Sequence, residues 1–163
     1  MQSWEELLAD FRETIERSTE RLLLISETQS LTSKVAGKWI PKEVIGHLVD
    51  SAANNHQRFV RSQFTDDLVF VGYQQEDWVR AQRYREEPWS QLVNLWRYYN
   101  LHLLHIMAGV PETSRTKLRQ RHNLDQIAWE TVKESEPVTL DFFMRDYVGH
   151  LKHHLSQIWE RSS

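Results

Sequence analysis

The 163-residue chain contains no cysteine. This absence excludes disulfide bonds, a thiol nucleophile and thiolate metal ligands supplied by the chain itself. Only five glycines and four prolines occur, too few for the turns of a β-sandwich but compatible with long helices. No apolar run approaches the roughly 20 residues of a membrane-spanning helix, and the N-terminus lacks the basic and apolar regions of a signal peptide. We therefore expect a cytoplasmic protein with no membrane partner.

Neither sign of charge dominates the sequence. Twenty basic and 23 acidic residues are intermixed and give a formal net charge of −3, which argues against nucleic acid as the main partner. Seven Trp, five Tyr and six Phe can fill the core of one domain, which we expect to span residues 1–163. This aromatic load, notably Trp4, Trp89 and Trp159, is large for one bundle, so a homodimer is a possible assembly.

Four segments show the apolar spacing of amphipathic helices, with no convincing strand between them. Their starts carry typical signals: a capping box at Ser3–Glu6, prolines at the first turns of two helices, and Thr139 as an N-cap. A short helix is also expected at residues 125–133. The pattern predicts an all-α four-helix bundle. Its long helices are expected over residues 3–25, 41–64, 88–109 and 139–158.

Three of the eight histidines lie in the last predicted helix, in the run 150–154. Residues four apart share one face of a helix, so His150 and His154 can direct their imidazoles at one ion. Their face continues into apolar residues, and two unpaired imidazoles would be costly on a buried face. His153 is rotated away by about 100° per residue and is a poorer ligand. The alternative is that His150 and His154 are ordinary surface or hydrogen-bonded core histidines.

His47, in the second predicted helix, is the third candidate ligand. Asp50 and Ser51 belong to a polar stripe that continues along its face. Such a stripe is usually a solvated edge, but it can also line a cavity, and metal sites in bundles are built from facing helices. We therefore predict one divalent metal ion on His47, His150 and His154.

A glycine directly precedes His47 and His150. Glycine within a helix costs about 1 kcal/mol relative to alanine, so it often has a packing reason. We expect Gly46 and Gly149 to let the helices approach closely at the site, with neutral drift as the alternative.

The two histidine segments, Trp39–Asp50 and Tyr147–Ile158, resemble those of the DinB/YfiT-like superfamily of metal-binding four-helix-bundle proteins. Tyr73 and Trp78 fall where that family often has an aromatic pair. The resemblance implies an up-down-down-up bundle with a long crossover between the second and third helices, and its metal triad maps onto the same three histidines. Ile40 departs from the family, in which Ser or Thr commonly precedes the proline. Members with known activity are often S-transferases of low-molecular-weight thiols, or isomerases.

Three neutral histidine ligands leave a coordination position open, as in catalytic metal sites. Zinc suits this ligand set best, and nickel, iron and manganese also suit imidazole. A bound metal ion lowers the pKa of a coordinated water or thiol, so hydrolysis and thiol transfer are both open to such a site. Asp50 and Tyr73 are the candidates for catalytic acid–base or ligand-orienting roles.

Three functional hypotheses follow. The first is a metal-dependent S-transferase that activates a small-molecule thiol toward an electrophilic substrate; because the chain has no cysteine, the thiol would be a substrate. The second is a metal-dependent hydrolase. The third is a non-catalytic metal or small-molecule binding protein in a stress response.

Overall fold

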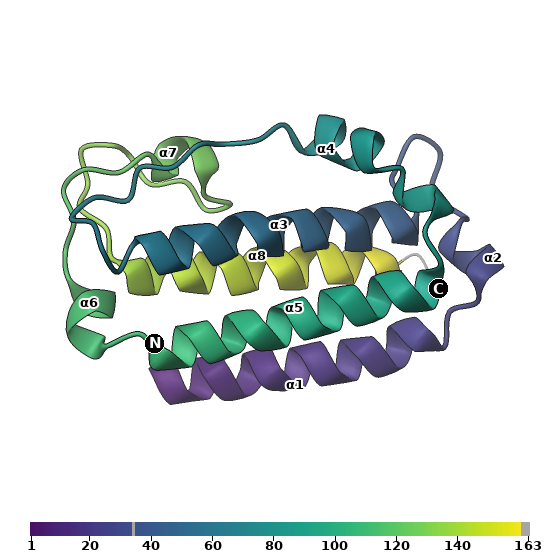
Figure 1. The fold of residues 1–163 in the computed structure, drawn as a ribbon, viewed down its shortest axis with the longest axis horizontal. Coiled ribbons are helices and arrows are strands. Elements are labelled where there is room, and N and C mark those ends of the chain that lie inside the picture. The colour runs from purple at the N-terminus through teal and green to yellow at the C-terminus, as the bar shows by residue number, and fades with distance from the viewer. Residues whose placement is uncertain (34, 161–163) are drawn as a thin grey trace.

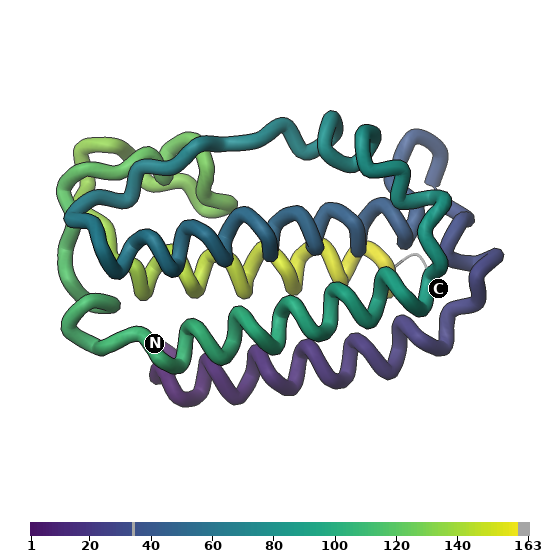
Figure 2. The backbone as a smooth tube through the Cα atoms, viewed as in Figure 1, coloured from purple at the N-terminus to yellow at the C-terminus, as the bar shows by residue number. Residues whose placement is uncertain are grey.

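The computed structural model describes residues 1–33 and 35–160. Its long helices are α1 (Trp4–Leu23), α3 (Pro41–Arg61), α5 (Trp89–Gly109) and α8 (Leu140–Glu160). Figure 1 shows α1 and α8 running in one direction along the bundle, and α3 and α5 running in the other. The course is therefore up-down-down-up, and the all-α four-helix bundle expected from the sequence is confirmed. Because α3 and α5 are parallel, their link must return along the whole length of the bundle (Figure 2).

The predicted caps form at two of the helix starts. Ser3 N donates to Glu6 Oε2 at 2.7 Å and Glu6 N donates to Ser3 Oγ at 3.1 Å, which completes the capping box of α1. Thr139 Oγ1 accepts from Phe142 N at 3.0 Å in front of α8. Each bond satisfies an amide that has no partner inside its helix.

The start of α3 uses a different solution. Ile40 has no side-chain acceptor for the first amides, but its own N–H donates to Glu43 Oε2 at 3.1 Å. Pro41 at the first helical position has no N–H that would need a partner. The departure at Ile40 therefore leaves half of a capping box and does not prevent the helix from starting there.

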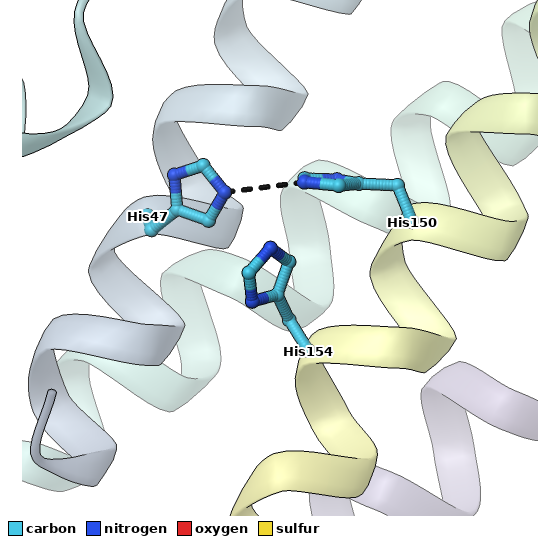
Figure 3. Close-up of side chains that lie close together, drawn as sticks. All are labelled: His47, His150 and His154. Carbon is cyan, nitrogen blue, oxygen red and sulfur yellow. Dashed lines mark hydrogen bonds between the residues drawn. The ribbon is translucent and has the colours of Figure 1, made fainter. Parts of the chain in front are cut away.

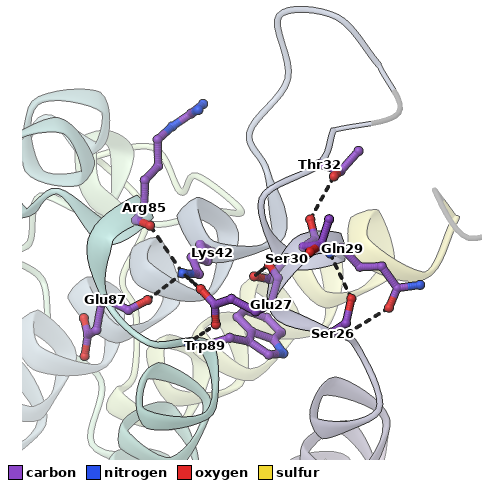
Figure 4. Close-up of polar contacts among 10 residues, drawn as sticks. Ser26, Glu27, Gln29, Ser30, Thr32, Lys42, Arg85, Glu87 and Trp89 are labelled. Carbon is purple, nitrogen blue, oxygen red and sulfur yellow. Dashed lines mark hydrogen bonds and ion pairs between the residues drawn. The ribbon is translucent and has the colours of Figure 1, made fainter.

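A buried lysine fixes the same end of the bundle (Figure 4). Lys42 is 1% exposed, and its ammonium group pairs with Glu27 and donates to the carbonyls of Arg85 at 3.3 Å and Glu87 at 2.7 Å. Glu27 begins the short helix α2 (Glu27–Ser30). One side chain thus ties α3 to the α1–α3 link and to the segment that leads into α5.

Both long connections contain short helices. The α3–α5 link carries α4 (Gln75–Gln82) and the 3₁₀-helix η1 (Tyr84–Glu86), and the α5–α8 link carries α6 (Glu112–Thr116) and α7 (Leu124–Ile127). The two links join through Leu68, whose N–H donates to Arg121 O at 3.0 Å and whose carbonyl accepts from Asn123 N at 3.2 Å. They cover the side of the bundle formed by α3 and α8 (Figure 1).

The helix predicted at residues 125–133 is wrong beyond Ile127. The amides of Trp129 and Glu130 donate instead to the carboxylate of Asp146 on α8, at 2.9 and 2.7 Å. This carboxylate takes the N–H groups that a continued helix would have bonded to its own carbonyls. The tertiary contact therefore ends the helix.

The core lies between the four long helices, and it accommodates the tryptophans that suggested a dimer. Trp89 is 3% exposed, and its indole donates to Leu22 O at 2.8 Å. Trp4 and Trp159 lie partly buried against the core, each with an arginine guanidinium over its ring. The homodimer stays a prediction, but these residues no longer motivate it. Within the described residues, no helix combines the length and apolar character needed to cross a bilayer.

Candidate metal centre and adjoining cavity

His47 of α3 meets His150 and His154 of α8 where the two helices pack together (Figure 3). His47 Nε2 lies 3.2 Å from His150 Nε2, and one ring nitrogen of each histidine lies within 4.8 Å of the other two. No other described residues form such a group of three histidines or carboxylates. Two nitrogens bound to one tetrahedral zinc at about 2.0–2.1 Å lie about 3.3 Å apart. The cluster therefore has the dimensions of a one-metal site.

Gln157 orients the third imidazole. His154 Nδ1 donates to Gln157 Oε1 at 3.0 Å, which leaves the lone pair on Nε2. In Figure 3 this second nitrogen points toward His47 and His150. Metal-binding histidines are commonly oriented by such a bond on the far nitrogen. Gln157 was not among the residues predicted from the sequence, although its i, i+3 spacing from His154 was a usable signal.

Burial keeps the three imidazoles neutral. Desolvation, followed by the nearby His154, lowers the pKa of His47 to about 3, and desolvation is also the main reason that the pKa of His150 is lowered to about 3. Burial lowers the pKa of His154 as well, against the hydrogen bond to Gln157. Neutral imidazoles carry the lone pairs that a cation binds. The donor set and its protonation state therefore fit one divalent metal ion.

A cavity of about 830 Å³ adjoins the cluster, with His47 and His150 in its wall. The remaining wall comes from α3, α8 and both long connections. Small-molecule sites typically have volumes of about 300–1,000 Å³. A small molecule in this cavity reaches the histidine cluster from the side of His47 and His150.

Tyr73 lies in the wall of this cavity. Its ring centroid is 4.9 Å from that of Trp78, so the two residues form the aromatic pair that the family resemblance implied. Burial is the main cause that raises the pKa of Tyr73 to about 12, so the phenol is protonated at neutral pH. The phenol can therefore donate a hydrogen bond, while the catalytic role of Tyr73 stays a prediction.

Asp50 is buried away from the cavity wall. Its Oδ1 accepts from Tyr84 OH and from Gln82 Nε2, both at 2.6 Å, and thereby holds α4 and η1 against α3. Among the described residues, Asp50 makes no hydrogen bond to the three histidines. This geometry gives Asp50 a role in positioning the crossover, while its acid–base role stays a prediction.

The prediction that Gly46 and Gly149 bring helices into close contact is wrong. A Cβ on Gly46 would lie 2.1 Å from Cδ2 of Tyr84, and a Cβ on Gly149 would lie 2.9 Å from Cζ3 of Trp129. Each glycine makes room for an aromatic ring that comes from a connection. The glycines thus help to seat the two links that cover the cavity side of the bundle.

Comparisons with known proteins support the fold. No family model matches the chain, and no curated protein does. Among solved structures, the chain is similar to YfiT from Bacillus subtilis, a probable metal-dependent hydrolase with an unusual four-helix bundle topology. The TM-score is 0.77 at 20% sequence identity, with 98% of this chain and 87% of YfiT covered. The chain therefore shares the four-helix fold of YfiT, as its histidine segments led us to expect.

Proposed function

We propose that this protein is a metal-dependent enzyme whose His47, His150 and His154 hold one divalent ion, zinc by ligand type. The observation that carries the proposal is the convergence of three neutral imidazoles at the edge of a small-molecule cavity. The likeness to YfiT, a probable metal-dependent hydrolase, adds support. When bound, such an ion lowers the pKa of a coordinated water or thiol.

Transfer of a low-molecular-weight thiol to an electrophile is the reaction that the cavity favours. Many metal-dependent hydrolases use a carboxylate beside the metal as general base. Among the described residues, Asp146 is the single carboxylate in the cavity wall, and its oxygens already accept two backbone N–H groups. A thiol held by such an ion would release its proton to solvent without a carboxylate base. Because the chain has no cysteine, the thiol comes from a substrate.

The residues of the chain would then bind and orient the two reactants. The protonated phenol of Tyr73 can donate to an electronegative group of the electrophile. Phe143 and Trp129 offer apolar wall, and the amides of Asn123 and Gln126 offer polar contacts.

Hydrolysis is the second candidate, favoured by the likeness to YfiT. Zinc-loaded protein with a haloarene electrophile and, in separate reactions, glutathione, bacillithiol, mycothiol or coenzyme A distinguishes the two. We expect conjugation above the uncatalysed rate, lost in His150→Ala and kept in His105→Ala, which changes an exposed histidine on α5. Hydrolysis of ester or amide panels without any thiol would contradict the transferase. Tight metal binding with neither activity would favour a non-catalytic binding protein.

A further inference from the structure

Three buried arginines of the described chain differ in their partners. Arg115 pairs with Asp141, and Arg119 donates to three backbone carbonyls. Arg58 is 6% exposed, donates to the carbonyl of Val71 at 3.1 Å, and has no carboxylate partner among the described residues. Buried charges are normally paired, because desolvation of an unpaired charge is costly. The guanidinium of Arg58 is therefore buried with one backbone carbonyl as its hydrogen-bond partner and without an ion pair among the described residues.

Arg58 belongs to the wall of the cavity beside the histidine cluster. On α3 it follows His47 after eleven residues, with Ser51 and Asn55 between them on the same face of the helix. At about 1.5 Å per residue the Cα atoms of His47 and Arg58 lie about 16 Å apart; both side chains lean toward the N-terminus, and the longer arginine reaches further. The guanidinium is therefore on the order of 10 Å from the cluster along the cavity.

Arg58 and Asp146 are the charged side chains of the cavity wall among the described residues, and no ion pair joins them. Within the described part of the chain, Arg58 is the one cationic side chain in the wall, and Asp146 is bound to backbone amides. A divalent ion on the three neutral histidines would add further positive charge. Asn55 also lines the cavity, is 6% exposed, and its Oδ1 has no hydrogen-bond partner among the described residues. These features fit a ligand that brings a negative group and a hydrogen-bond donor.

We infer that Arg58 binds the carboxylate of an elongated substrate whose reacting end lies at the histidine cluster. Guanidinium and carboxylate match as a planar pair with two parallel hydrogen bonds. The substrate class is a small molecule with its carboxylate on the order of 10 Å from the atom that reaches the cluster. Asn55 Oδ1 accepts a donor from the middle of such a molecule. The assignment of the reacting end rests on the proposed function, whereas the carboxylate site does not.

Calorimetric titration of the metal-free protein with octanoate and with octanamide isolates the carboxylate site, because the two probes differ only in the charged group. Charge-assisted hydrogen bonds predict that octanoate binds the wild-type protein at least about tenfold more tightly than octanamide. Arg58→Gln should abolish this preference. Arg61→Gln removes an exposed charge from the same helix outside the cavity wall and should keep it. Arg58→Lys keeps the positive charge but lacks the planar guanidinium, so it should lower the preference for octanoate severalfold. This variant keeps the test decisive if Arg58→Gln does not fold.

A second titration separates this inference from the proposed function. ω-Mercaptooctanoate should bind the zinc-loaded protein more tightly than octanoate. His150→Ala should remove this additional affinity for the thiol and leave the preference for carboxylate over amide unchanged. A carboxylate preference without the gain from the thiol contradicts the proposed function and leaves the role of Arg58 intact. The Arg58 site is overturned if the wild type shows no preference for octanoate, or if Arg58→Gln retains the preference.

Discussion

Replacing Gly46 with alanine tests whether the packing of Tyr84 against α3 holds the α3–α5 connection in place. The new Cβ would lie 2.1 to 2.5 Å from three atoms of the Tyr84 ring, so the ring must move. Tyr84 is 4% exposed, and its hydroxyl donates to Asp50 Oδ1 at 2.6 Å. The ring therefore cannot move aside without weakening a buried hydrogen bond to a carboxylate.

The expected magnitude follows from three contributions. Overpacking a buried site costs about 1–3 kcal/mol, and losing a hydrogen bond to a charged group costs about 1.5–3 kcal/mol. The higher helix propensity of alanine offsets about 1 kcal/mol of this loss in stability. Gly46→Ala should therefore lower the free energy of unfolding by about 1.5–5 kcal/mol, and the Tm by roughly 3–20 °C for a chain of this size.

Two matched glycines serve as controls in thermal and urea unfolding followed by circular dichroism. Gly149→Ala meets Trp129, which is 44% exposed and can shift, so a loss below about 1 kcal/mol is expected. Gly109→Ala meets nothing within 4 Å and should be neutral or stabilising by up to about 1 kcal/mol. If Gly46→Ala unfolds at the same temperature as Gly109→Ala, the packing of Tyr84 on α3 is refuted.

Two further predictions concern the histidine cluster. In metal-free protein the pKa values of His47 and His150 fall from 6.5 to about 3 on folding, so the unfolded chain binds more protons below pH 6.5. The free energy of unfolding should therefore reach its full value above pH 6.5 and fall by on the order of 2–4 kcal/mol at pH 5, as measured by urea titration. Equal stability at both pH values would contradict the burial of neutral imidazole rings. Gln157→Leu removes the bond to His154 and should weaken zinc affinity about 10- to 100-fold in a chelator competition; unchanged affinity would exclude an orienting role for Gln157.

The long helices and the histidine trio could be predicted because their signals are local. Apolar periodicity located all four helices, and the spacing of His150 and His154 placed two imidazoles on one face. The choice of His47 needed the further assumption that a polar stripe lines a cavity. The structure supports that assumption, since Ser51 lies in the cavity wall beside His47.

The connections could not be predicted, because non-local contacts decide their structure. Asp146 ends the expected helix at Ile127 by taking the backbone N–H groups of the following residues. Asp50 is part of the predicted polar stripe, yet Tyr84 and Gln82 engage it from segments more than thirty residues later in the chain. Gly46 and Gly149 correctly indicated close packing at these positions. No pattern in the sequence indicated that the packing partners would be aromatic rings from the connections.

Metal content, measured by mass spectrometry on protein purified without a nickel column and dialysed against zinc, tests the central claim most directly. The structure predicts one tightly held divalent ion per chain in the wild type. The same content is expected in His105→Ala, in which an exposed histidine of α5 is changed. His150→Ala should lose the ion. A wild-type protein without metal, or a combined His47, His150 and His154 to alanine variant that keeps its full content, would contradict the metal centre.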